Sequence, residues 1–136
     1  MVSFNVWSGS DYLKNVNDIY ANMELSSTEF WASNGNRSIQ ITSNTTGYQA
    51  ATLCEITANI NETYTGKLDI LNPTSDVYLR LIEVESSQYT DVTISSTNVA
   101  QESVISKQVT GSGTFRFLLI TRSSLTCYID NVRLTR

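Results

Sequence analysis

The sequence predicts an all-β domain, a sandwich of two antiparallel β-sheets, from three observations. Ser, Thr and Asn make up roughly a third of the chain, far above ordinary usage, and β-branched residues and Tyr fill the apolar segments. From Ile39 onward, apolar and polar side chains alternate as they do in half-buried strands. Turn-forming residues interrupt this alternation about every eight to twelve residues. Two packed sheets explain the mixed strand faces better than a barrel around one continuous lumen.

The first three strands follow from alternation between turn signals. RSIQITS (37–43) puts Ile39 and Ile41 on one face and ends at the turn-forming run NTTG. YQAATLCEITA (48–58) alternates in the same way until NINE interrupts it. TYTGKLDIL (63–71) is the third strand, and it ends at NPTSD, the clearest turn, which holds the only proline.

The fourth strand, VYLRLIEVE (77–85), is apolar on both faces. Such a strand is expected either in the centre of a sheet that is covered on both sides or along a groove. Residues 86–103 are rich in loop formers and leave room for one short strand. Three further strands, 104–110, 114–121 and 125–134, close the domain, with the flexible turn GSG before the second of them.

The first 35 residues follow no such rhythm. The apolar side chains of DYLKNVNDIYANMEL (11–25) recur at helical spacing, so this segment is predicted either as a helix or as short irregular strands. The chain is long enough for one domain over residues 1–136, within which residues 1–21 are either part of the fold or an extension or linker from a larger parent protein. Trp31 is expected in the core, whereas Trp7 fits either an exposed platform or a docking residue.

Charge and composition exclude several classes of protein. The net charge is −4 and Lys and Arg do not cluster, so nucleic acid is not an expected partner. No apolar run approaches the roughly 18 residues that span a bilayer, so membrane insertion is not expected. The chain has no His, which excludes a Ser or Cys nucleophile working with His and argues against a zinc site. Cys54 and Cys127 lie in apolar runs and are expected either as buried free thiols or as one disulfide between the sheets.

The order of the motifs resembles a known family. GNRSIQIT (35–42) is followed by Gly-Tyr-Gln-Ala (47–50), by Tyr-Thr-Gly (64–66) and by a Gly-Ser-Gly-Thr turn (111–114), and the chain ends in YIDNVRL (128–134). In this order the segments resemble the jelly-roll carbohydrate-binding modules attached to xylanases and cellulases, within the galactose-binding-like group. The resemblance implies a jelly-roll topology and an extracellular or cell-surface location, which includes the surface of a virion. Three Asn-x-Ser/Thr sequons fit such a location.

The resemblance also implies a structural Ca²⁺ ion. In that family the Asp of the terminal motif binds the ion together with an acidic residue near the start of the domain. Asp130 matches the motif position here, and Glu24, in Asn-Met-Glu (22–24), is its candidate partner. Carboxylates and carbonyls at a strand end can supply the oxygens that Ca²⁺ requires. The alternative is that Asp130 only accepts hydrogen bonds from backbone N–H groups at a β-bulge.

Aromatic residues define the candidate ligand-binding face. Sugar rings have apolar faces that stack on Tyr and Trp, while polar side chains contact their hydroxyls. The resemblance places Tyr48 at the start of a strand whose leading aromatic faces the concave groove. Tyr78 and Arg80 share one face of the strand over 77–85, about 6.6 Å apart along it. Gln49 and Tyr89 are placed at the rim.

Two functions of different classes follow from these observations. The first is a non-catalytic module, and not an enzyme, that binds a polysaccharide or a cell-surface glycan. The second is a structural or adhesive jelly-roll module that packs with other domains of a larger surface or virion assembly, such as a tail or fibre, without a sugar site. The strand over 77–85 would favour the second function if its aliphatic side chains line the groove, namely Leu79, Leu81, Ile82 and Val84.

A glycosidase is a third interpretation. Glu83 and Glu85 lie on one strand face about 6.6 Å apart, within the range of carboxylate pairs that hydrolyse glycosidic bonds. Two carboxylates on one strand face are also common as solvated charges, and a single domain of 136 residues offers few further polar catalytic partners.

Overall fold

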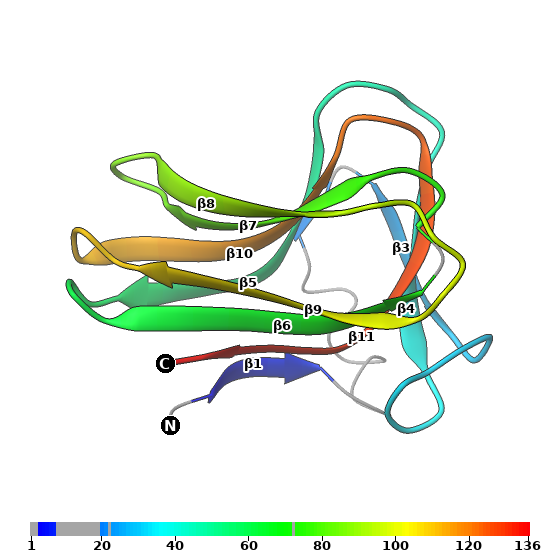
Figure 1. Ribbon diagram of the computed structural model, residues 1–136, viewed down its shortest axis with the longest axis horizontal. Coiled ribbons are helices and arrows are strands. Elements are labelled where there is room, and N and C mark those ends of the chain that lie inside the picture. Colours follow the sequence, from blue (N-terminus) through cyan, green and yellow to red (C-terminus); the bar gives the residue numbers. More distant parts are fainter. Residues whose placement is uncertain (1–2, 8–19, 22, 72) are drawn as a thin grey trace.

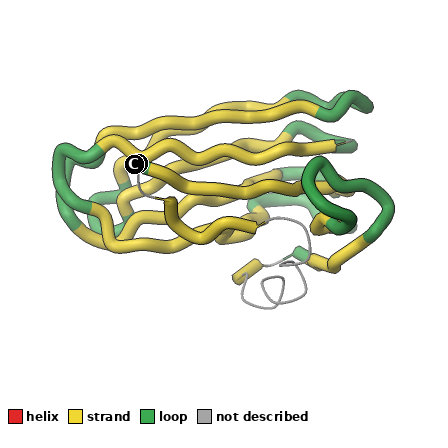
Figure 2. The backbone as a smooth tube through the Cα atoms, turned by 90° about the horizontal axis from the view of Figure 1, so that it is seen from below, coloured by secondary structure: helices red, strands yellow, loops and turns green. Residues whose placement is uncertain are grey.

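The computed structural model describes residues 3–7, 20–21, 23–71 and 73–136. Within these ranges the chain forms eleven β-strands joined by loops, without a helix (Figures 1 and 2). The strands make two antiparallel sheets that pack against each other as a jelly-roll β-sandwich, which confirms the predicted fold class. A search of the same ranges for a helix with the length and apolarity to cross a membrane finds none.

Sheet A contains the last strand of the chain at its centre. Its order is β3 (Glu24–Thr28), β4 (Ser38–Ser43), β11 (Leu125–Thr135), β6 (Thr63–Leu71) and β9 (Gln101–Gln108), and β1 (Ser3–Trp7) also pairs with β11. β11 pairs with β4 through Ile129 and with β1 from Val132 onward, so it changes partner in the middle. Residues 3–7 therefore belong to the sheet.

Sheet B carries the other five strands. Its order is β2 (Tyr20–Ala21), β5 (Gln49–Ala58), β10 (Gly113–Thr121), β7 (Val77–Glu83) and β8 (Gln88–Ile94). β10 is central and pairs with β5 on one side and β7 on the other. The edge strands β8 and β9 follow each other in the chain and lie in opposite sheets, at the side of the sandwich that faces the viewer in Figure 1.

The core is the layer of side chains between the two sheets. Tyr64, Phe115 and Phe117 are its largest fully buried members, and the rings of Tyr64 and Phe115 lie 5.1 Å apart. The Tyr64 hydroxyl accepts a hydrogen bond from the Asn59 N–H at 3.1 Å. Gly66 faces the Phe117 ring so closely that an added Cβ would lie 2.8 Å from it. Position 66 is an inward-facing position of β6, and the Phe117 ring fits against it because glycine has no side chain.

The structure decides between alternatives that the sequence left open. Tyr20–Ala21 and Glu24–Thr28 are strands, so the short-strand alternative for 11–25 holds there and the helical one fails, while residues 8–19 and 22 lie outside the described part. Residues 86–103 contain the edge strand β8, where the sequence left room for one short strand. The expectation for Trp31 is wrong. Trp31 is half-buried and lies outside the core; Trp7 lies in β1, but its side chain is outside the described part.

Both cysteines are buried in the core as thiols that form no disulfide, Cys54 from sheet B and Cys127 from sheet A. This is the first of the two alternatives given by the sequence. Burial raises the pKa of the Cys127 thiol to about 12. The thiol is therefore protonated at neutral pH and is a poor nucleophile.

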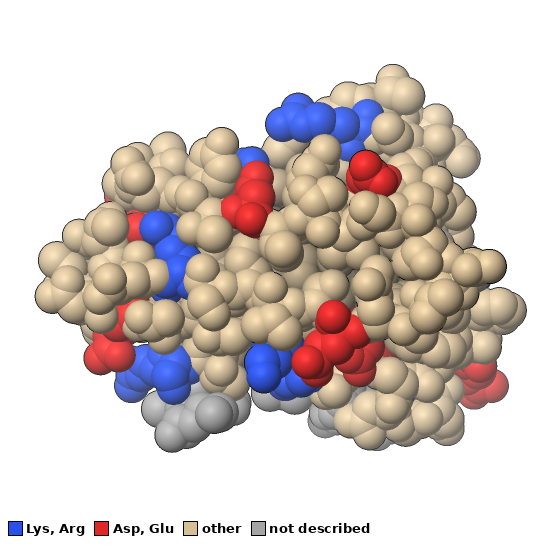
Figure 3. All heavy atoms as spheres, viewed as in Figure 1, with Lys and Arg blue, Asp and Glu red and all other residues tan. Residues whose placement is uncertain are grey.

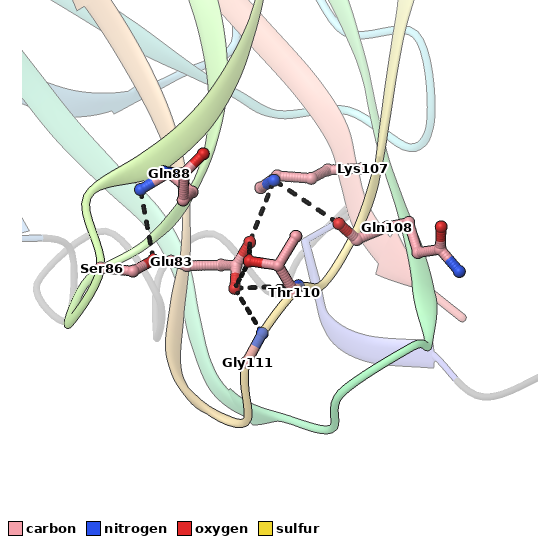
Figure 4. Close-up of polar contacts among 7 residues, drawn as sticks. All are labelled: Glu83, Ser86, Gln88, Lys107, Gln108, Thr110 and Gly111. Carbon is pink, nitrogen blue, oxygen red and sulfur yellow. Dashed lines mark hydrogen bonds and ion pairs between the residues drawn. The ribbon is translucent and has the colours of Figure 1, made fainter.

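A buried ion pair joins the two sheets at one end of the sandwich. Lys107 of β9 lies 3.0 Å from the carboxylate of Glu83 at the end of β7 (Figure 4). The same carboxylate accepts hydrogen bonds from the N–H groups of Thr110 and Gly111, at 3.0 and 2.9 Å, and from the Thr110 hydroxyl. Burial raises the pKa of Glu83, but the bonds from Lys107, Thr110 and Gly111 outweigh it, so the pKa lies below its ordinary value.

We expect Glu83→Gln to lower the free energy of unfolding by about 2 kcal/mol at pH 7, because Lys107 loses a charged partner. The pKa of Glu83 is lower in the folded than in the unfolded state, so its stabilisation is present above the unfolded value of about 4.3 and is lost as the pH falls through the folded one. Chemical denaturation at several pH values should show the two proteins converging below about pH 4. Glu85→Gln, at an exposed carboxylate, is the control and should change stability far less. An equal effect of the two substitutions would contradict this role of Glu83.

Candidate functional site

Four of the five predicted ligand-binding residues lie on the outer face of sheet B. In β7, Leu79 and Leu81 point into the core, so Tyr78 and Arg80 point outward, as expected. Tyr89 of β8 pairs with Ile82 and therefore lies on the same outer face. The two leucines are fully buried and do not line this face. They therefore do not favour the function in which this face packs against another protein.

Arg80 holds the ring of Tyr89 in place. Its guanidinium lies 3.9 Å from the centre of the Tyr89 ring and donates to both carboxylate oxygens of Asp91, at 2.7 and 2.9 Å. The Asp91 bond is the main cause that raises the pKa of Arg80, and Tyr48 and Tyr89 add to it. Tyr89 is 54% exposed, so the ring presents surface to solvent while Arg80 supports it. The charge of Arg80 is neutralised by Asp91.

Tyr48 and Arg122 form a second aromatic–arginine pair on this face. Tyr48 precedes β5 and is 50% exposed, and the Arg122 guanidinium lies 5.6 Å from the centre of its ring. The Gly47 N–H donates to the Arg122 carbonyl at 3.0 Å, just beyond the paired ends of β5 and β10. Arg122 was not among the predicted site residues. Its signal was the alternation in TFRFLLITR, which places Arg122 on the same face as Arg116, Leu118 and Ile120.

The prediction that Gln49 lies at the rim is wrong. Gln49 is 2% exposed and points toward the core side of β5. Its side-chain oxygen accepts from the hydroxyls of Ser43 and Thr45, and its nitrogen donates to the carbonyls of Thr45 and Ser123, at 3.0 and 3.2 Å. Gln49 therefore ties the loop before β5 to the turn after β10. These are the segments that carry Tyr48 and Arg122, so Gln49 is a positioning residue.

Asp130 is a buried hydrogen-bond acceptor at a bulge in β11. It is 0% exposed, and one carboxylate oxygen accepts from the N–H groups of Ser33 and Asn34 at 2.7 and 2.8 Å. The other oxygen accepts from the Asn131 N–H at 2.7 Å. The register of β11 shifts between Asp130 and Arg133, and Asn131 has a φ of 53°, which together define the bulge. This arrangement matches the hydrogen-bonded alternative stated for Asp130.

Glu24 and Asp130 are not neighbours. The register pairs Glu24 with Thr42, which places its Cα on the order of 15 Å from that of Asp130, two strands away. The carboxylate beside Asp130 is that of its cross-strand partner Asp69, which accepts from the Ser33 hydroxyl at 2.6 Å. Within the described ranges, no group of three or more acidic, Cys or His side chains could hold a metal ion. The predicted pair therefore does not fit a shared Ca²⁺ ion.

The carboxylates considered for glycoside hydrolysis hold the loop between β9 and β10. Glu83 is buried in the ion pair with Lys107, and Glu85 lies in the turn after β7, where it accepts from the Thr114 N–H at 3.0 Å. Lys107 and the loop N–H groups are therefore the bonding partners of these two carboxylates within the protein. This gives the pair a structural role at the end of the sandwich.

Comparisons with known proteins show the fold. No family model and no curated protein matches the sequence. Solved structures that resemble it include the enzymatically active domain of tailspike protein 4 of bacteriophage CBA120, with a TM-score of 0.76, 12% identity and coverage of 96% of this chain and 21% of that chain. They also include a xylan-binding domain of carbohydrate-binding module family 22, with a TM-score of 0.68, 13% identity and coverage of 96% of this chain and 92% of that chain.

A third is a family 61 module in complex with β-1,4-galactotriose. Its TM-score is 0.65 at 10% identity, and the match covers 96% of this chain and 98% of that chain.

The chain therefore has the jelly-roll β-sandwich of carbohydrate-binding modules. It spans nearly the whole length of the two modules and about a fifth of the tailspike chain. The expected resemblance to these modules is confirmed at the level of the fold.

We expect Asp130→Asn to destabilise the domain by about 2 kcal/mol, because an amide NH₂ would replace an oxygen that accepts from backbone N–H groups. Urea denaturation measures this change. Asp69→Asn is the matched control, since Asp69 lies on the same face but is less buried, and it should cost clearly less. Equal stability of wild type and Asp130→Asn would contradict the role given to the carboxylate.

Calcium binding at Asp130 stays a prediction of the family resemblance, and thermal melting in EDTA and in added Ca²⁺ tests it. A bound ion should raise the melting midpoint of the wild type and of Glu24→Gln, but not of Asp130→Asn. A wild-type midpoint that is the same in EDTA and in Ca²⁺ would contradict the prediction.

Proposed function

We propose that this domain is a non-catalytic carbohydrate-binding module that recognises a polysaccharide or a cell-surface glycan on the outer face of sheet B. The observation that carries the proposal is the pair of half-exposed rings, Tyr48 and Tyr89, each beside an arginine on the same sheet face. A supported ring with one open side suits the apolar face of a sugar. The cation on the other side restrains the ring and lowers the entropy lost on binding.

The separation of Tyr48 and Tyr89 along and across the sheet favours a chain of sugars over a single one. The strand register places the Cα atoms of Tyr48 and Tyr89 on the order of 25 Å apart, on opposite corners of the sheet. Between them lie the outward side chains of Tyr78, Arg80 and Thr93, which offer hydroxyl and guanidinium groups for sugar hydroxyls. Leu118 and Ile120 also belong to this face by register but are buried, so the polar and aromatic groups form most of its accessible part, together with half-buried Ile82.

The comparisons support this class of ligand. The two modules that match almost end to end are described as xylan-binding and as bound to β-1,4-galactotriose. By extension, we propose an extracellular or cell-surface location for this domain, within a larger protein. The size and the single-sandwich architecture suit a module that brings a polysaccharide to other domains.

The tailspike match favours a second candidate function. Among the three structures described above, the tailspike domain has the largest TM-score, 0.76, and it belongs to a much longer chain. This domain would then be a structural or adhesive jelly roll of a surface or virion assembly, with its sheet faces covered by neighbouring domains.

We expect the wild-type domain to bind defined polysaccharides on a glycan array, and Tyr48→Ala and Tyr89→Ala each to weaken that binding about tenfold, equivalent to about 1.4 kcal/mol. Each substitution removes a stacking surface without disturbing the core. Phe30→Ala is the matched control, because Phe30 is 69% exposed but stacks on Tyr128 of sheet A. Its binding should equal that of the wild type. No reducing sugar should be released from the bound polysaccharide.

A different result would support the second candidate function: the domain would bind no glycan on the array, and light scattering would show trimers or larger assemblies. Release of reducing sugar that is lost in Glu83→Gln would instead revive the glycosidase interpretation.

A further inference from the structure

Most cationic side chains of the described residues lie in ion pairs, and Arg122 does not. Figure 3 shows positive and negative groups interspersed on one face of the molecule, and many positive charges are matched by a carboxylate within 4.0 Å. Such ion pairs hold Arg37, Arg80, Lys107, Arg116 and Arg133. No carboxylate of the described residues forms an ion pair with Arg122, which is exposed.

The nearest acidic position across the sheet does not neutralise Arg122. Extending the β10–β7 register by two residues places Asp76 opposite Arg122. The Asp76 side chain instead accepts from the Ser96 N–H at 3.1 Å, and its carbonyl accepts from the Thr121 hydroxyl at 3.2 Å. Within the part of the chain that the structure describes, neither Asp76 nor another carboxylate forms an ion pair with Arg122, so its charge can serve a partner from outside.

The position of this charge is fixed relative to the Tyr48 ring. The guanidinium lies 5.6 Å from the ring centre, and the backbone bond from Gly47 to Arg122 holds the two segments together. Buried Gln49 adds side-chain bonds to the carbonyls of Thr45 and Ser123, one on each segment. A sugar stacked on Tyr48 would have its substituents beside an unneutralised, pre-positioned guanidinium.

We propose that Arg122 makes this module selective for acidic glycans, with the carboxylate of a uronic acid bound beside Tyr48. A planar guanidinium can donate two parallel hydrogen bonds to a carboxylate, which a neutral sugar hydroxyl cannot accept in the same way. The other end of the face suits neutral sugars, because Asp91 already neutralises Arg80 beside Tyr89. The net charge of −4 gives no long-range attraction for a polyanion, so selectivity rests on this one contact. The inference rests on the proposed glycan-binding function.

Isothermal titration with oligogalacturonides, and with the same oligosaccharides after reduction of their carboxyl groups to alcohols, tests the proposal. The wild type should bind the acidic form about tenfold more tightly than the reduced form, as expected for charge-assisted hydrogen bonds. Arg122→Gln should remove this preference, so that the acidic and reduced forms bind with equal affinity. Arg122→Lys keeps the charge without the planar fork and should retain part of the preference. Arg37→Gln, at a paired arginine of the other sheet, is the control and should bind both forms as the wild type does.

The outcomes separate this inference from the function on which it rests. Equal wild-type affinity for the two forms, or a preference that persists in Arg122→Gln, would overturn the selectivity but leave glycan binding in place. Failure to bind any glycan, here and on the array, would overturn both. A sulfated oligosaccharide that binds more tightly than the uronic acid form would overturn the assignment of a carboxylate.

Discussion

The buried carboxylate of Asp130 is the interaction on which the rest of sheet A depends. It lies where β11 stops pairing with β4 and begins to pair with β1, and the bulge at Asn131 makes this change possible. Its oxygens accept from three backbone N–H groups, two of which belong to the loop that crosses the outer face of sheet A. A carboxylate with no exposed surface is tolerable because these donors compensate for its lost hydration.

The same principle positions the loops at other corners of the sandwich. Glu83 joins β7 to β9 and to the loop after it, and Gln49 joins the loop before β5 to the turn after β10. In each case a buried polar side chain holds backbone or side-chain groups that no strand ladder reaches. The exposed side chains beside these joints, Tyr48 and Arg122 above all, therefore stand on segments that are held from within.

Alternation in the sequence predicted the inner strands because each has one face in the core. It also placed Tyr78 and Arg80 on a shared outer face, where the structure has them. It left room for one short strand in 86–103 but could not place the bounds of β8, since an exposed edge strand has little apolar pattern to detect. Gln49 was misplaced because its neighbour Tyr48 is at the rim, and successive residues of a strand point to opposite faces. Arg122 was missed because it follows an apolar strand and lies far from Tyr48 in the chain.

The sequence by itself determined that the chain is an all-β sandwich and that its aromatic and arginine side chains would lie on strand faces, because these properties follow from local alternation and turn residues. The tertiary structure alone decided which strands are neighbours. That choice put Asp69, rather than Glu24, beside Asp130, and it put Arg122 beside Tyr48, where no carboxylate of the described residues pairs with it. Such facts depend on register between strands distant in the chain. Register is set by how whole faces pack in the core, which no single segment specifies.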